Sequence, residues 1–412
     1  MQHDKTVSTR RPSFHYRSLR LAHHVPPRMP TRITCVLAIL LMACHSSPDE
    51  PEAPLVPELV QFDDDSLPGA ADLVVNPVAL TVRTYDGSDE MVHPDALVFP
   101  TAWHGSRFWY VATPYPRGNA GFENPSGYSG SSSDDWNALP GVANPLALPV
   151  SAAYLSDPDV SFDPVLGELR VYYRQTTADS DELFLLTSRT GSDWSVPQLV
   201  AHDVKFGLIS PAVVRMPDGA WRMWTVNANN GGCKARATGV ALTQRRSRDG
   251  RKWGGAEPVA LVVPHHVPWH WDVQYIRARK EYWALVAAFP DGTNCSRSAV
   301  FFAHSADGTT WTTSPTPLLE PGAFAPMRDL VYRSTFRYFA ASDVVTVWFS
   351  GAREEKGAFH YSLATARYPR AELMRRVEAA NPDGLARNVS PVDDRHRAET
   401  DPARAAFINA FP

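Results

Sequence analysis

The chain has 412 residues, of which 44% are hydrophobic and 11% aromatic, so it can bury a sizeable core and is not a disordered protein. Its formal net charge is −4, and the charge becomes −10 without residues 1–43, which carry seven basic residues and one acidic residue. This acidic balance lacks the basic surface that nucleic acid requires, so we expect no nucleic-acid partner.

The N-terminal segment has the pattern of a bacterial secretion signal. Residues 33–43 are mainly hydrophobic, follow Arg32 and end before Cys44. This run is too short to span a bilayer, whereas a basic flank, a short hydrophobic run and small residues before a cleavage site are typical of a secretory signal. Residues 41–44 (LMAC) resemble the bacterial lipobox, which implies cleavage before Cys44 and lipidation of its sulfur. The alternative interpretation of the run is a buried strand or helix.

Two consequences follow for the N-terminal region. Met29 supplies a start just before the basic flank, so residues 1–28 fit an upstream extension that is not part of the signal. Residues 44–70 are rich in Pro, Asp and Glu, a composition that predicts a tether because it cannot bury enough hydrophobic surface to fold. We expect signal peptide 1–43, tether 44–70 and a lipid-anchored location in the bacterial cell envelope, at the outer membrane or cell surface.

A short motif recurs through the rest of the chain and closes a run of strand-forming residues each time. It is found at residues 188–194 (SRTGSDW), 247–253 (SRDGRKW) and 305–311 (SADGTTW), with a degenerate copy ending at Trp136. The closing tryptophans are 58, 59 and 58 residues apart, which is close to the period of a β-propeller blade. The motif also resembles a shortened sialidase Asp-box, which is a structural turn.

Two further landmarks occur five times. Aromatic strands are found at 108–110, 169–173, 221–224, 282–285 and 345–349, and each follows an opening pentapeptide, at 93–97, 157–161, 210–214, 270–274 and 333–337. We therefore predict an all-β fold, a five-bladed β-propeller of four-stranded antiparallel blades over residues 71–375. A strand within residues 73–83 is expected to close the ring. The chain beyond residue 368 is expected to be helical and then irregular, with residues 376–412 as a C-terminal tail.

The opening pentapeptides are expected to line the propeller axis. Because side chains alternate along a strand, the first and third residues of each should point the same way. The first positions are His93, Asp157, Ser210, His270 and Arg333, and the third positions are Asp95, Asp159, Ala212, Asp272 and Thr335. Loops between second and third strands should reach the same rim, and they carry Glu123, Arg174, Asn227 and Cys233. The structural alternative is a wet channel that tolerates polar side chains without using them.

Cysteine usage fits an oxidising compartment. Cys233 and Cys295 occupy equivalent loops of adjacent blades, so we predict that they form a disulfide. A zinc-type site on this pair is not supported because no further Cys completes it. No cofactor or metal is predicted; a calcium ion held on the axis by carboxylates and water is the alternative, without an oxygen-ligand motif to indicate it.

Residues 90–365 resemble the five-bladed propeller clan of glycoside hydrolases that includes arabinanases, β-xylosidases and invertases. The resemblance is carried by blade number, blade length and the Asp-Pro openings, of which residues 157–163 (DPDVSFD) are the most similar. It implies a general acid and a base or nucleophile, both carboxylates, with a third carboxylate that orients the sugar or tunes the acid. The chain departs from that pattern, because blade 1 has His93 where an Asp is expected and no later blade supplies the usual acidic Glu.

The resemblance gives the following candidate roles. Asp95 or Asp157 is the base, His270 or Glu123 the acid, and Asp272 the tuning residue. Substrate-binding candidates are His93, Asp159, Arg174, Asn227, Arg333 and Trp269. We expect a monomeric glycoside hydrolase or another glycan-active enzyme that acts on an oligo- or polysaccharide. The alternatives are a non-catalytic glycan- or peptide-binding lipoprotein and a scaffold lipoprotein.

Overall fold

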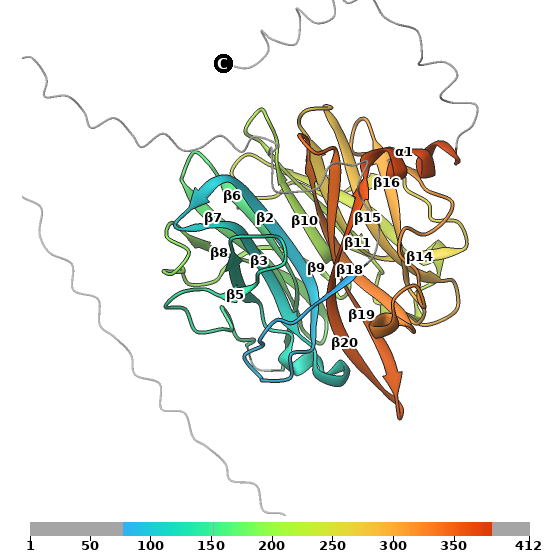
Figure 1. The fold of residues 1–412 in the computed structure, drawn as a ribbon, viewed down its shortest axis with the longest axis horizontal. Helices are drawn as coiled ribbons and strands as arrows, with labels where there is room; N and C mark the ends of the chain where they lie inside the picture. Colours follow the sequence, from blue (N-terminus) through green and yellow to red (C-terminus); the bar gives the residue numbers. More distant parts are fainter. Residues whose placement is uncertain (1–76, 151, 381–412) are drawn as a thin grey trace, which may run out of the picture. The chain divides into compact units, whose positions relative to one another are not determined.

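Five antiparallel sheets of four strands form the part of the chain that the computed structural model describes, residues 77–150 and 152–380 (Figure 1). The innermost strands are β2 (Met91–Trp103), β6 (Tyr154–Asp163), β10 (Ile209–Arg215), β14 (His266–Ile276) and β18 (Leu330–Phe339). Each contacts the innermost strands of two other sheets, in the order β2, β6, β10, β14, β18 and back to β2. The five sheets are therefore the blades of a closed propeller, as predicted.

The outer strands complete each blade in chain order, with one exception that closes the ring. The second strands are β3 (Ser106–Pro114), β7 (Glu168–Thr176), β11 (Trp221–Asn227), β15 (Glu281–Pro290) and β19 (Val344–Glu355). The third strands are β4 (Ser126–Gly130), β8 (Ser180–Ser188), β12 (Ala241–Ser247), β16 (Ala299–Ser305) and β20 (Ala358–Pro369). The outermost strands are β5 (Asn137–Ala138), β9 (Gln198–Val204), β13 (Glu257–Val259), β17 (Thr312–Thr313) and β1 (Val78–Leu80).

Ring closure joins the two ends of the described chain. Strand β1 pairs with β20 in antiparallel register, with Val78 opposite Thr365. This confirms the closing strand expected within residues 73–83, and Figure 1 shows the first and last blades side by side. A short helix, α1 (Arg370–Glu378), follows β20 and buries Leu373 and Val377. The predicted signal, the tether, Cys44 and most of the predicted tail lie outside the described residues.

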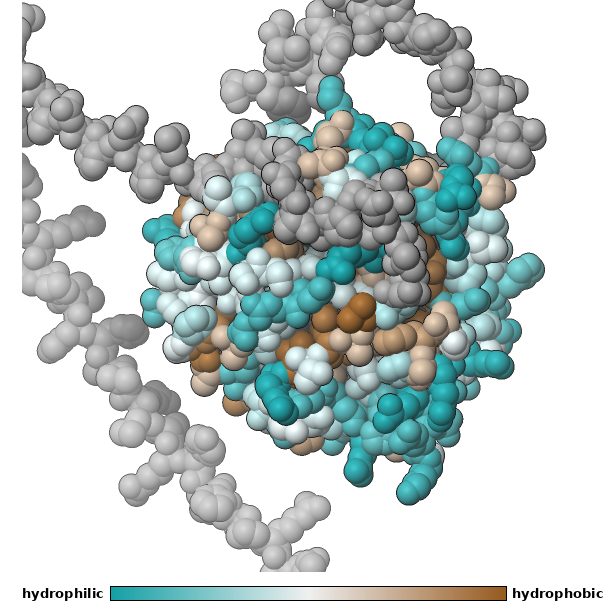
Figure 2. Space-filling model, viewed as in Figure 1, coloured by the Kyte–Doolittle hydropathy of each residue, from teal (hydrophilic) through white to brown (hydrophobic). Residues whose placement is uncertain are grey.

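Hydrophobic side chains fill the spaces between blades. Tryptophans 221, 224, 271, 283 and 348 are all at most 1% exposed. Short 3-10 helices occupy the loops, namely η2 (Pro116–Gly118), η3 (Ala120–Phe122), η4 (Gly232–Lys234), η5 (Ala237–Gly239) and η6 (Ala325–Met327). Figure 2 shows mostly polar side chains on the face in view, with hydrophobic ones in scattered patches. Among the described residues, no helix is long and hydrophobic enough to span a membrane.

The closing motif is a turn that joins neighbouring blades, which explains its recurrence. Its glycines have positive φ values, 80° at Gly191, 68° at Gly250 and 76° at Gly308. Side chains of the preceding blade lie against each one, so that a Cβ on Gly191 would come within 2.2 Å of the Trp109 ring. At Gly308 the backbone oxygen accepts a hydrogen bond of 2.8 Å from the indole of Trp224. Only glycine satisfies both the backbone conformation and this close approach.

Asp307 of the third closing motif provides a pH-dependent test of the turn. Its Oδ1 accepts the backbone N–H groups of Thr309 and Thr310 at 2.7 and 2.8 Å, and the Thr310 bond is the main reason that the pKa of Asp307 is lowered. A depressed folded-state pKa adds stability above the unfolded pKa of about 3.9, and this stability disappears as the pH falls towards the folded value.

We expect Asp307→Asn to lower Tm by about 1–2 °C, a small effect because the side chain is exposed. The difference from wild type should be constant between about pH 5 and 8 and shrink below about pH 4. Thermal unfolding followed by circular dichroism across this range measures it. An undiminished difference at pH 3 would contradict this explanation.

Candidate functional site

The side chains predicted to line the axis lie where the innermost strands bulge. In all five blades the register with the second strand shifts near the opening residue, as between Ser156 and Asp159 in β6. His93, Asp157 and Ser210 have φ values of 54°, 52° and 53°, and each precedes a proline. Such backbone costs about 1–3 kcal/mol per residue and is characteristic of functional sites. The bulges thus re-aim these opening residues, which alternation alone did not predict.

Three opening residues from blades 1, 2 and 4 meet at one point: His93, Asp157 and His270, here called the opening trio. Asp157 Oδ1 lies 3.4 Å from His93 Nε2 and 3.3 Å from His270 Nδ1. The three residues are 2%, 0% and 2% exposed. Residues from distant parts of the sequence therefore converge, as the propeller interpretation requires.

Arg174 in β7 holds Asp157 in its ionised form. The Arg174 Nε group lies 3.0 Å from Asp157 Oδ2, and its Nη1 lies 3.3 Å from Asp181 Oδ2. Burial alone would raise the pKa of Asp157, but the charge of Arg174, followed by the imidazoles of His93 and His270, brings the pKa well below its usual value. The carboxylate therefore stays negative in a site that excludes water.

The environment of His93 keeps its ring neutral and fixes its orientation. Its Nδ1 lies 3.1 Å from Thr113 Oγ1 and 3.5 Å from Glu123 Oε1. If Nδ1 carries the proton and donates on that side, the lone pair of Nε2 points towards Asp157. Burial lowers the pKa of both His93 and His270. Both rings are thus in the form that coordinates metal ions.

The opening trio fits a divalent metal ion. His93 Nε2, His270 Nδ1 and Asp157 Oδ1 are buried atoms that make no hydrogen bond, and they face one another. Ligands about 2.0–2.2 Å from a tetrahedral ion are roughly 3.3–3.6 Å apart, which matches the two spacings above. Two imidazoles and one carboxylate are a ligand set of catalytic zinc sites, and the Glu123–His93 contact is the outer-shell partner that such sites carry.

Three polar side chains surround the opening trio. Arg333 is 1% exposed, its Nη1 lies 3.5 Å from Asp157 Oδ1, and its Nε and Nη1 make no hydrogen bond. The ring of Tyr332 packs against both imidazoles, with its centroid 5.4 Å from that of His93 and 4.6 Å from that of His270. Burial, and then the charge of Asp157, raises the pKa of Glu123 well above its usual value. Glu123 is therefore a buried carboxyl that holds a proton at higher pH than a free one.

The acidic third positions form a separate layer along the axis: Asp95, Asp159 and Asp272, here called the acid trio. Each accepts a hydrogen bond from a backbone N–H of the next blade. The donors are Val160 for Asp95, Val213 for Asp159 and Phe336 for Asp272. Thr335 Oγ1 lies 2.7 Å from Asp95 and 2.9 Å from Asp272 and links them. These aspartates therefore hold blades together, a role that the sequence prediction did not include.

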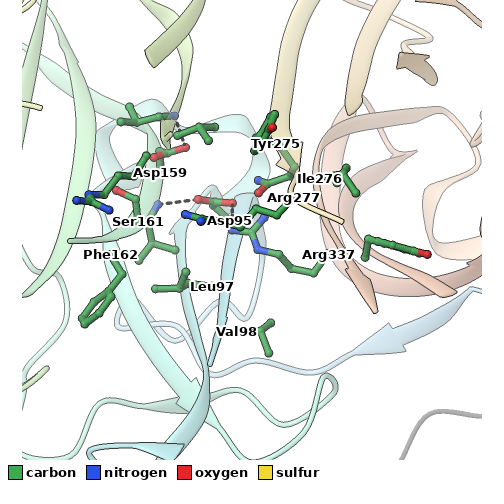
Figure 3. A pocket seen from close by; sticks show the side chains of 16 residues that line it. Asp95, Leu97, Val98, Asp159, Ser161, Phe162, Tyr275, Ile276, Arg277 and Arg337 are labelled. Carbon is green, nitrogen blue, oxygen red and sulfur yellow. Dashed lines mark hydrogen bonds and ion pairs between the residues drawn. The ribbon is translucent and has the colours of Figure 1, made fainter. Parts of the chain in front are cut away.

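Asp95 and Asp159 of the acid trio border a cavity of about 140 Å³ that extends along the later residues of the innermost strands, whereas Asp272 does not line it. Figure 3 shows Asp95, Asp159 and Ser161 together at this cavity, with Arg337 beside them. None of the opening trio lines it. The candidates expected at one mouth thus divide into two layers, with Asp95, Asp159 and Asp272 one step along the axis from His93, Asp157 and His270.

The remaining predicted residues have different surroundings. Asn227 ends β11 and accepts the backbone N–H of Asn229, and no contact among the described ones joins it to the opening trio. Trp269 is 6% exposed and packs edge-on against His270, so its ring faces are not presented to solvent. The predicted disulfide between Cys233 and Cys295 is confirmed.

Sequence reasoning missed Thr113, Asp181 and Tyr332 as neighbours of the site. Thr113 and Asp181 lie on the second strand of blade 1 and the third strand of blade 2, and Tyr332 directly precedes the opening residue of blade 5. The position of Tyr332 was a usable signal, because a bulge at an opening residue also brings its neighbour to the axis. The metal-ligand set was missed because its members belong to three blades and form no contiguous motif.

Comparison with known proteins gives one relative in sequence. No family model matches the chain. The chain is 28% identical over 318 residues to an A type blood N-acetyl-alpha-D-galactosamine deacetylase of Flavonifractor plautii, a match that covers 65% of this chain. It spans only 40% of the length of that relative.

A solved structure with a TM-score above 0.5 confirms the fold. An N-acetylgalactosamine deacetylase from F. plautii, in complex with blood group B trisaccharide, superposes with a TM-score of 0.66 at 22% identity over 73% of this chain and 96% of that one. A thermostable family-43 glycoside hydrolase is more distant, with a TM-score of 0.46 and 12% identity over 66% of this chain and 88% of that one.

Proposed function

We propose that this protein is a metal-dependent hydrolase that removes the N-acetyl group from an amino sugar of a glycan. The observation that carries the proposal is the convergence of three buried ligand atoms without hydrogen bonds in the opening trio, at separations of 3.3 and 3.4 Å. His93, Asp157 and His270 would hold a divalent ion, and the chemistry it would supply is polarisation of a carbonyl oxygen and activation of water. The N-acetylgalactosamine deacetylase relative supports the choice of bond.

The residues around the trio suit amide hydrolysis. Water adds to the acetamide carbonyl carbon, the C–N bond breaks, and acetate and the free amine result. Glu123 is positioned to hold and return the proton that the departing nitrogen needs, because its pKa is raised by burial. Arg333, a buried guanidinium with two N–H groups that make no hydrogen bond, supplies donors to the oxygen on which negative charge develops.

Hydrolysis of a glycosidic bond is the second candidate. It is favoured by one observation: the pKa of Asp157 is lowered and that of Glu123 is raised, and both carboxyl groups contact the ring of His93. Two carboxyls with opposite shifts are what a base and a general acid require. That mechanism needs no metal, so chelation separates the two candidates.

Incubation of the purified protein with a glycan ending in N-acetylgalactosamine tests the proposal. We expect acetate release and a sugar that keeps its linkage but loses its acetyl group, both measured by mass spectrometry. Prior treatment with a chelator should abolish the reaction, and added Zn²⁺ or Mn²⁺ should restore it. Release of free monosaccharide that chelation does not affect would favour glycosidase activity, and no turnover on a broad panel would favour a binding protein.

We also propose that the protein acts at the bacterial cell surface on oligo- or polysaccharide. The lipobox-like residues 41–44 and the disulfide between Cys233 and Cys295 both suit an anchored envelope protein. Replacing Cys44 with Ala is expected to move the protein from the membrane fraction to the soluble fraction of the cell envelope. Retention in the membrane fraction would contradict lipid anchoring.

A further inference from the structure

The acid trio is not fully explained by its role in joining blades. Both oxygens of Asp95 accept hydrogen bonds, from Val160 N and from Ala96 N and Thr335 Oγ1. Asp159 uses only Oδ1, and its Oδ2 is buried without any hydrogen bond. Burying a carboxylate oxygen without a hydrogen-bond partner costs free energy, which indicates that a ligand binds this oxygen.

A second polar side chain points to the same occupant. Ser161 follows Asp159 by two residues on β6, is 7% exposed, and its Oγ makes no hydrogen bond. Ser161 and Asp159 both line the 140 Å³ cavity shown in Figure 3. This hydroxyl is outside the acid trio, so the carboxylates and the serine indicate a ligand independently. The cavity has room for the water molecules that a cation keeps.

The charges and spacings suit a cation that prefers oxygen. One ligand oxygen from each member of the acid trio lies within 4.8 Å of the others, and about 4.8 Å is the largest distance between two ligands that are each 2.4 Å from one ion. Arg337 approaches Asp95 and Asp272 only to 3.9 Å, and among the described ion pairs none includes Asp159. Among the described residues, no basic side chain is therefore paired closely with the acid trio.

We propose that the acid trio, together with Ser161, binds a hydrated divalent cation of the calcium class, at a site separate from the opening trio. An all-oxygen ligand set selects a hard cation, whereas the two imidazoles of the opening trio select a transition metal. The ion links blades 1, 2 and 4 on the axis and leaves the chemistry to the opening trio. This inference does not depend on the proposed deacetylation.

Thermal unfolding of the full chain with and without Ca²⁺ tests the site. After removal of metals with a chelator, 5 mM Ca²⁺ is expected to raise Tm by about 2–5 °C in the wild type. The same rise is expected in His270→Ala, which damages only the opening trio, and in Glu320→Gln, which removes an exposed carboxylate elsewhere. Asp159→Asn is expected to abolish the rise.

Ser161→Ala keeps the test informative if Asp159→Asn does not fold. It leaves every carboxylate in place, and we expect it to weaken Ca²⁺ binding by about fivefold in calorimetric titration. The proposal is overturned if Ca²⁺ leaves the wild-type Tm unchanged, if Asp159→Asn keeps the full rise, or if His270→Ala loses it. Failure of deacetylation alone leaves this result unaffected.

Discussion

Replacing His270 with alanine is expected to lower the rate of acetate release by at least about a hundredfold. Loss of an outer partner of a metal ligand costs about 10–100-fold in affinity or activity, and loss of the ligand itself costs more. His270 Nδ1 lies 3.3 Å from Asp157 Oδ1 and makes no hydrogen bond, so its removal takes away a ligand without breaking a hydrogen bond of that atom.

The control is His304→Ala in the same blade. His304 lies on β16, and its side chain is partly exposed. Its Nε2 is 2.9 Å from Glu281 Oε2. We expect this variant to keep wild-type activity and wild-type metal content. Bound metal, measured by plasma mass spectrometry, should fall in His270→Ala and stay unchanged in His304→Ala. Full metal content together with lost activity in His270→Ala would show that His270 has another role.

Arg174→Met is expected to lower the free energy of unfolding by about 3–5 kcal/mol. Arg174 is 4% exposed and is the guanidinium that faces both Asp157 and Asp181, each of which is 0% exposed. Methionine fills a similar volume but leaves two carboxylates buried without their cation. Removing one partner of a buried ionic cluster is destabilising for that reason, even where the intact cluster adds little net stability.

Urea unfolding followed by tryptophan fluorescence measures the loss, and Arg353→Met is the matched control. Arg353 pairs with Glu355 at 2.8 Å, with side chains 42% and 47% exposed. Such a surface pair contributes about 1 kcal/mol or less, so Arg353→Met should be close to wild type. Equal losses in the two variants would mean that Asp157 does not depend on Arg174.

The repeat made the fold predictable from the sequence. The arrangement of the polar side chains in two layers along the axis could not be predicted in this way. Blade length follows from the spacing of the closing tryptophans, and blade number follows from the aromatic strands and opening pentapeptides, which occur five times. Alternation placed His93 and Asp95 on one surface, but it could not show that a bulge separates them into two layers. The register shift depends on the pairing of β2 with β3, which is a property of the folded sheet.

The candidate site was predicted in composition but not in chemistry. His93, Asp157, His270, Glu123 and Arg333 were all candidates, and the structure brings them together. Their roles depend on which atoms lack a hydrogen bond and on the distances between those atoms, where a few tenths of an ångström matter. Neither quantity is encoded in a local pattern, because each ligand comes from a different blade.

A crystal grown with Zn²⁺ or Mn²⁺ and measured at the absorption edge of the metal tests the metal centre most directly. We predict one strong anomalous peak about 2.0–2.2 Å from His93 Nε2, His270 Nδ1 and Asp157 Oδ1. The same peak should be missing in His270→Ala. A wild-type map with no peak among these three atoms, in crystals of protein that deacetylates its substrate, would contradict the metal-dependent mechanism.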